Sequence, residues 1–191
     1  MRHRLAVIAS IVMMSTLQIS PARATPIDPG TVTCGEMVKI LSSAPETQAA
    51  KDSHARIGVL LIWMAGFLAP ESQGSVVDMV QIQTDAEKIS AACAEAPNLG
   101  VKTVASKFWE KEQPTTSNSI DISTLTCSTL TQKRDTNSAA GLLWLIGNYA
   151  SDEDTPMFDM TEVGKSIEKI SRECAKGPNI SITTAAEKVL E

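Results

Sequence analysis

Apolar residues recur along this chain at helical spacing, and this pattern predicts an all-α fold. Residues 57–69 are apolar and carry no charge. A run of this length is typical of a buried helix and is too short to span a membrane. In two other segments the apolar positions follow i, i+4, i+7 and i+11, which places them on one helical face. These sets are Ile82, Ala86, Ile89 and Cys93, and Val163, Ile167, Ile170 and Cys174.

Two capping boxes predict where helices begin. Thr33-Cys34-Gly35-Glu36 predicts a short helix that runs to about residue 41, and Thr84-Asp85-Ala86-Glu87 predicts one that runs to about residue 96. In such a box the Thr and Glu side chains each accept a hydrogen bond from a backbone amide of the first turn. We expect residues 42–56, which are polar, to form a surface loop or a helical extension, and residues 101–109 to form a last short helix.

The pattern occurs twice. Residues 88–98 (KISAACAEAPN) recur 81 residues later as residues 169–179 (KISRECAKGPN), with seven of eleven positions identical. The same offset relates Trp63 to Trp144 and Gly66 to Gly147. We interpret this as an internal duplication, which predicts two tandem domains of about four helices each. The expected domains are residues 25–111 and 125–191, with residues 112–124 as a polar linker. In the second domain we expect helices around Cys127 and over residues 139–150, 161–175 and 181–190.

The amino-terminal segment has the features of a secretory signal peptide. Residues 1–4 include two arginines, residues 5–17 are mostly apolar, and residues 22–24 give a small-x-small pattern. This combination predicts that residues 1–24 are a signal peptide, removed after about Ala24. The mature chain is therefore expected to be exported.

Charge excludes two classes of partner. Residues 1–24 hold three of the 17 Lys and Arg residues and none of the 22 Asp and Glu residues, so the mature chain has a net charge of −8. A chain of this charge is poorly suited to nucleic acid or to an anionic membrane surface. We expect neither as a partner.

Four cysteines in an exported chain predict two disulfides, for which three connectivities exist. The duplication selects one of them, because each repeat holds one early and one late cysteine: Cys34–Cys93 and Cys127–Cys174. On the chain-entropy account each bond adds about 4 kcal/mol. The competing interpretation is a zinc site, but the chain has no CxxC motif and the mature part has one histidine, His54. We therefore predict no metal and no cofactor.

The same scarcity of histidine argues against an enzyme. Catalysis by Ser-His-Asp or Cys-His needs a histidine, and His54 falls in the segment of twelve residues that the second repeat lacks. The carboxylates Asp152, Glu153 and Asp154 are better explained as a solvated loop than as an acid–base pair. We predict no catalytic residues.

Each repeat opens on Thr-Cys (residues 33–34 and 126–127), continues with an apolar Trp-x-x-Gly helix (residues 63–66 and 144–147) and places its second cysteine shortly before Pro-Asn. These three short motifs resemble the HdeA/HdeB family of periplasmic acid-stress chaperones. The resemblance implies a helical domain with one disulfide that forms a folded homodimer at neutral pH. In acid such a domain loosens and binds unfolding proteins through apolar surface. Because this chain carries two units, we expect either an intramolecular pseudo-dimer or a homodimer in the periplasm.

The resemblance also suggests roles for two sets of residues. The apolar helices would bind unfolded client proteins, although at neutral pH they are expected to be ordinary core. The client-binding candidates are Leu60, Leu61, Trp63, Met64, Phe67, Leu142, Leu143, Trp144, Ile146 and Tyr149. Carboxylates would act as the acid trigger, with solvated helix faces as the alternative explanation. The trigger candidates are Asp85, Glu87, Glu95, Glu162, Glu168 and Glu173.

A second function class fits the same sequence. Small exported helical proteins with disulfides also serve as inhibitors or immunity proteins that block a toxin or a cell-wall enzyme. Such a protein would present a fixed patch and act at neutral pH, whereas an acid chaperone would protect clients only in acid. A structural module of an envelope assembly is a third interpretation.

Overall fold

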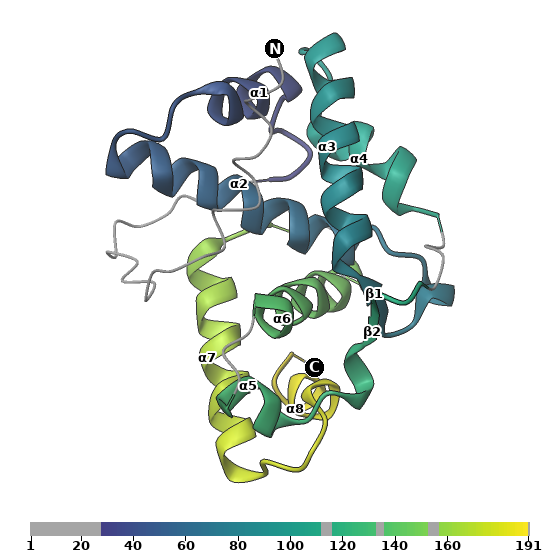
Figure 1. Cartoon of the computed structure of the whole chain (residues 1–191). Helices are drawn as coiled ribbons and strands as arrows, with labels where there is room; N and C mark the ends of the chain where they lie inside the picture. Colours follow the sequence, from purple (N-terminus) through teal and green to yellow (C-terminus); the bar gives the residue numbers. More distant parts are fainter. Residues whose placement is uncertain (1–27, 112–115, 133–135, 153–156, 191) are drawn as a thin grey trace.

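Helices make up most of the computed structural model, which describes residues 28–111, 116–132, 136–152 and 157–190 (Figure 1). The predicted signal peptide and Glu153 and Asp154 lie outside the described residues. The fold within these ranges is all-α, as the sequence predicts. Its helices are α1 (Cys34–Ser42), α2 (Gln48–Phe67), α3 (Met79–Glu95), α4 (Val101–Trp109), α5 (Cys127–Gln132), α6 (Thr136–Tyr149), α7 (Met160–Lys176) and α8 (Ile182–Leu190).

Two short strands and three 3-10 turns complete the described elements. Strand β1 (Val76–Asp78) pairs antiparallel with β2 (Ser119–Asp121), with Val77 opposite Ile120. The turns are η1 (Glu71–Gln73), η2 (Ile122–Thr124) and η3 (Ala150–Asp152). Because β1 precedes α3 and β2 precedes α5, the sheet joins two parts of the chain that are distant in sequence.

The chain forms two halves with the same internal arrangement. We call residues 28–111 half one and residues 116–190 half two. The amide of Cys34 donates to the carbonyl of Leu99 at 2.8 Å, and the amide of Cys127 donates to the carbonyl of Ile180 at 2.9 Å. Each half also has an isolated antiparallel β-bridge at this place, between Thr33 and Gly100 in half one and between Thr126 and Ser181 in half two. Each first helix is thus held against the segment that enters its own fourth helix.

The turn before the first helix is also repeated. The carboxylate of Asp28 accepts the amide of Gly30 at 2.7 Å, and that of Asp121 accepts the amide of Ser123 at 3.0 Å. Part of the expected linker is therefore structured, because residues 119–124 form β2 and η2. Ile122 in this segment is only 1% exposed and belongs to the core. The polar composition does not predict this burial, because the polar side chains form local hydrogen bonds: Asp121 accepts the amide and hydroxyl of Ser123, and the Thr124 hydroxyl donates to the Asp121 carbonyl.

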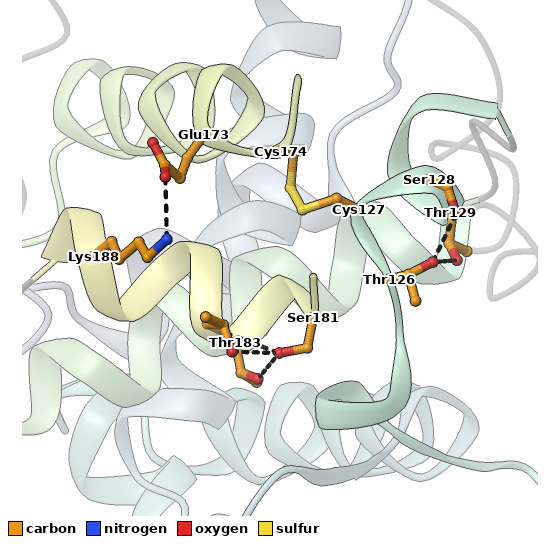
Figure 2. The surroundings of a disulfide bond; sticks show 10 residues. Thr126, Cys127, Ser128, Thr129, Glu173, Cys174, Ser181, Thr183 and Lys188 are labelled. Carbon is orange, nitrogen blue, oxygen red and sulfur yellow. Dashed lines mark hydrogen bonds and ion pairs between the residues drawn. A yellow bond between two sulfur atoms is a disulfide. The ribbon is translucent and has the colours of Figure 1, made fainter. Parts of the chain in front are cut away.

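Disulfides join the first and third helices of each half. Cys34 bonds to Cys93 with a Cα–Cα distance of 4.7 Å, and Cys127 bonds to Cys174 with a Cα–Cα distance of 4.9 Å. This is the pairing that the repeat predicts. Figure 2 shows the second bond, which ties the start of α5 to the last turns of α7. Each disulfide restricts the unfolded chain and so adds stability to a half that is too small to gain much from hydrophobic burial.

Most helix boundaries follow the sequence, and one does not. The Thr33 capping box is present, with the amide of Thr33 donating to Glu36 at 3.0 Å. The expected box at Thr84 is wrong, because α3 begins at Met79 and the Thr84 hydroxyl donates to the Val80 carbonyl at 2.9 Å inside the helix. Asp78 caps α3 instead and accepts two amides of its first turn. Upstream, α2 begins at Gln48, so part of the polar insertion is a helical extension.

A continuous hydrophobic core extends through both halves. Helices α2 and α6 lie at its centre, and in Figure 1 the other helices of half one lie mostly above them and those of half two mostly below. The most extensive contact between any two described elements is the one between these helices. Within the described part of the chain, none of the helices is both long and apolar enough to cross a membrane.

Candidate functional site: the buried contact between the halves

Two glycines allow α2 and α6 to cross with their backbones in direct contact. A Cβ atom on Gly66 would lie 1.9 Å from the Trp144 carbonyl oxygen, and one on Gly147 would lie 1.9 Å from the Trp63 carbonyl oxygen. Real Cβ atoms do not approach backbone this closely, so only glycine fits at either position. Asn148 adds a hydrogen bond from its Nδ2 to the Gly66 carbonyl at 3.3 Å. The paired Trp-x-x-Gly motifs thus build a reciprocal contact between the halves.

Aromatic residues surround this crossing. The ring of Trp63 stacks on Phe67 with centroids 5.3 Å apart, and it meets Phe158 of half two at 5.5 Å. Trp144 of half two lines a small cavity together with Trp109 and with β1 of half one. Trp63, Trp109 and Trp144 are the three tryptophans of the chain, and each is 2% exposed. Their fluorescence would therefore report directly on opening of the contact.

The structure places the client-binding candidates at or beside this contact. All ten belong to α2 or α6, and they are buried or half-buried in this form of the protein. The buried ones are Leu60, Leu61, Trp63, Met64, Leu142, Trp144 and Ile146, and the half-buried ones are Phe67, Leu143 and Tyr149. None of them forms an exposed surface here, so binding through them requires a change of conformation.

Two carboxylates hold the strands that join the halves, and we call Ser75, Asp78, Thr116 and Asp121 the strand clasp. The Thr116 hydroxyl donates to Asp78, and the Ser75 hydroxyl donates to Asp121 at 2.6 Å. Each carboxylate thus belongs to one half and accepts a hydroxyl of the other. The sequence pattern alone did not identify either carboxylate. A signal existed for Asp78, because Asp159 lies 81 residues later and each of these two residues caps the third helix of its half.

Hydrogen bonds to the clasp favour the charged carboxylates. Burial raises the pKa of Asp78, but the Thr116 hydroxyl and the amides of Gln81 and Val80 outweigh it, so the pKa lies below its usual value. The Ser123 hydroxyl, followed by that of Ser75, lowers the pKa of Asp121. The folded protein therefore stabilises the ionised form of both carboxyls, because a neutral acid accepts these hydrogen bonds less well.

The predicted acid-trigger residues lie on α3 and α7, outside the contact. Asp85 is 3% exposed and accepts Lys88 Nζ and Gln81 Nε2, each at 2.9 Å. Glu87 is half-buried and Glu95 is exposed. On α7 the three candidates form ion pairs at the surface. These pairs are Glu162 with Lys165 at 2.6 Å, Glu168 with Arg172 at 3.8 Å, and Glu173 with Lys176 at 2.8 Å and Lys188 at 3.4 Å.

Hydrogen bonds and ion pairs shift the pKa of Glu173, Lys165 and Glu36, three groups outside the strand clasp. A hydrogen bond from Lys176, with a smaller contribution from Lys188, lowers the pKa of Glu173. The hydrogen bond to Glu162 raises the pKa of Lys165. In half one the backbone amide and hydroxyl of Thr33 lower the pKa of Glu36 in the capping box. The structure therefore distributes acid-sensitive groups over both halves and does not gather them at one point.

Candidates for other chemistry are few. Across the ranges the structure describes, no three His, Cys, Asp or Glu side chains are grouped so that they could hold a metal ion. His54 is 3% exposed and its Nε2 lies 3.2 Å from the Ser43 hydroxyl, which fits a satisfied core histidine. All four cysteines are in disulfides. That the protein is not an enzyme and needs no metal stays a prediction.

Comparison with known proteins gives one family. The HdeA/HdeB family model matches residues 99–184, which run from just before α4 to the first turn of α8. The match covers somewhat less than half of the chain and includes the second disulfide and the Trp144-x-x-Gly147 helix. No curated protein and no solved structure matches the chain. Residues 99–184 are thus similar to the HdeA/HdeB family.

Proposed function

We propose that this protein is a periplasmic acid-stress chaperone of the holdase type. In this proposal it arose by tandem duplication of an HdeA-like unit, so that one chain forms a pseudo-dimer. The observation that carries the proposal is the contact between α2 and α6, where two apolar helices meet backbone to backbone between the halves. The family similarity of residues 99–184 and the two disulfides, which are typical of exported proteins, support it.

Acid would weaken the closed form through its carboxylates. Groups such as Asp78 and Asp121 have a lower pKa in the folded protein than in the unfolded chain, whose values are near 4. Their contribution to stability is complete above the unfolded value and is lost as pH falls through the folded one. Protonation of all 22 carboxyls also takes the mature chain from −8 to about +14, which adds repulsion. Both effects favour opening in strong acid.

The disulfides limit how far the protein would open. Each half keeps its first helix tied to its third through a bond that does not titrate. Each of the four cysteines pairs within its own half, so no disulfide crosses the clasp or the α2–α6 contact. We therefore infer that acid separates the halves while each one stays compact, and that this exposes the apolar faces of α2 and α6 to clients.

A light-scattering assay tests the proposal. The mature chain is mixed with an aggregation-prone protein at pH 2–5 and at pH 7, and aggregation is followed with and without it. We expect protection in acid only, together with a red shift of tryptophan emission and uptake of a hydrophobic dye over the same pH range. Protection without any spectral change would refute opening of the halves.

A variant pair separates opening from general acid sensitivity. Asp78→Asn with Asp121→Asn removes the titration of the clasp but keeps side chains that accept hydrogen bonds, and Glu71→Gln is the matched control at an exposed acid. We expect the clasp variant to bind dye and clients at a higher pH than the parent, and the control to behave as the parent. A clasp variant with unchanged pH dependence would assign the trigger to other carboxylates. A lack of protection at every pH would favour the inhibitor or immunity class instead.

A further inference from the structure

A cluster of cations lies between α7 and α8 of half two. Four basic side chains and one carboxylate line an open depression of about 450 Å³, and they are Lys169, Arg172, Lys176, Lys188 and Glu173, with Val189 at its edge. This volume is in the range of small-ligand pockets. The concentration of positive charge contrasts with the net charge of −8 on the mature chain.

Glu173 arranges part of this cluster. Its side chain is 19% exposed and holds Lys176 Nζ at 2.8 Å and Lys188 Nζ at 3.4 Å. Figure 2 shows Glu173 and Lys188 pointing toward one another from α7 and α8. One carboxylate therefore positions two ammonium groups from different helices, and it neutralises only one charge of the four. Glu168 lies farther out, 3.8 Å from the Arg172 guanidinium, and both side chains are about two-thirds exposed.

Half one has no such cluster at the equivalent positions. The residues 81 positions earlier are Lys88, Ala91, Ala92, Glu95 and Lys107. Of the two lysines, Lys88 is already paired with the buried Asp85 at 2.9 Å. The architecture shared by the halves therefore does not require this charge pattern, which is a feature of half two alone.

We propose that this pocket binds a small anion that carries two or more phosphate groups. Ammonium and guanidinium groups bind phosphate through charge-assisted hydrogen bonds, and Arg172 can engage two oxygens at once. Glu173 offsets one of the four cations, and the three positive charges that remain around the depression exceed what a single phosphate needs, so a diphosphate or a doubly phosphorylated small molecule fits better. A large anionic surface fits less well, because the acidic remainder of the protein would be brought against it.

Calorimetric titration with pyrophosphate tests the proposal on the mature chain at neutral pH and low salt. We expect saturable binding that weakens as salt is added, and weaker binding of inorganic phosphate. Arg172→Gln with Lys188→Gln should lower the pyrophosphate affinity at least tenfold. The matched control, Lys51→Gln with Lys107→Gln, removes two exposed lysines of half one and should lower it less than twofold.

Several outcomes would overturn the proposal. One is the lack of saturable binding by the parent protein, and another is an equal loss in both variants, which would show a response to net charge alone. Binding to vesicles that contain anionic phospholipid, without binding of pyrophosphate, would assign the cluster to a membrane surface. Amide chemical shifts should change on α7 and α8 only. Because the titration is done at neutral pH without a client, its result is independent of the chaperone assay.

Discussion

The two halves share a backbone arrangement and differ in where they place their charges. Both have a disulfide from first to third helix, an Asp turn before the first helix and a Trp-x-x-Gly helix at the contact. On α3 of half one the buried Asp85 pairs with the exposed Lys88, whereas on α7 of half two Glu162 and Glu168 form exposed ion pairs and Glu173 is 19% exposed between two lysines. The elements that fix the fold are thus repeated, and the charges vary between the halves.

A second difference lies in the central helices. Helix α2 has 20 residues and α6 has 14, and the additional length of α2 comes from the polar insertion of half one. This extension buries His54 against Ser43, at the end of α1. The glycines of the crossing are unaffected by the insertion, because they follow their tryptophans by three residues in both halves. The contact therefore constrains the sequence more strongly than the helix ends do.

Removing either disulfide should have the largest effect, and a similar one in each half. The cysteine pairs are separated by 59 and 47 residues, so the chain-entropy account gives about 4 kcal/mol for each. The variants are Cys34→Ala with Cys93→Ala, and Cys127→Ala with Cys174→Ala, with unfolding followed in urea. If one pair costs far less than the other, the halves do not depend on their bonds equally.

A methyl group at the crossing should have the next largest effect. Gly66→Ala or Gly147→Ala forces a Cβ atom against backbone that cannot rotate away, so the helices must separate at a cost of about 3 kcal/mol. Gly58→Ala is the matched control on α2, since its Cβ would meet nothing within 4 Å. That change should stabilise the protein by about 0.5–1 kcal/mol, because alanine favours a helix over glycine. Equal effects at Gly66 and Gly58 in thermal unfolding would contradict the close crossing.

The clasp should change how stability depends on pH. Asp78→Asn or Asp121→Asn removes a carboxylate whose pKa is lowered in the folded protein, so each variant should lose about 1 kcal/mol at pH 7. Below the folded pKa the parent loses the same contribution, and the difference between parent and variant should shrink toward zero. Urea unfolding at pH 7, 5 and 3 measures this, with Glu71→Gln as a control that should follow the parent. A constant difference at all pH values would show that charge is not involved.

Local patterns in the sequence predicted the parts of the fold that local interactions determine. The expected helix over residues 101–109 is α4 (Val101–Trp109), and the repeat gave the disulfide pairing. The start of α3 was missed because Asp78 provides a better cap than Thr84 in a segment that pairs as a strand. The clasp was missed because its hydroxyl–carboxylate bonds join residues 38 and 46 positions apart. The glycine motif was found, but its reciprocal packing follows only from the crossing of α2 and α6.

The smallest effects should separate the acidic side chains of α3 from those of α7. Asp85 and Glu162 each pair with a lysine three residues later, but the Asp85 side chain is 4% exposed and that of Glu162 is 64% exposed. Asp85→Asn should lower stability by about 1 kcal/mol, because a buried acceptor loses its charge next to Lys88. Glu162→Gln should leave stability unchanged within error, since solvent screens exposed pairs. Thermal unfolding at neutral pH measures both. A larger loss at Glu162 would mean that exposed ion pairs on α7 hold half two together. The halves would then differ in the kind of interaction that stabilises them, and not in the burial of their acids.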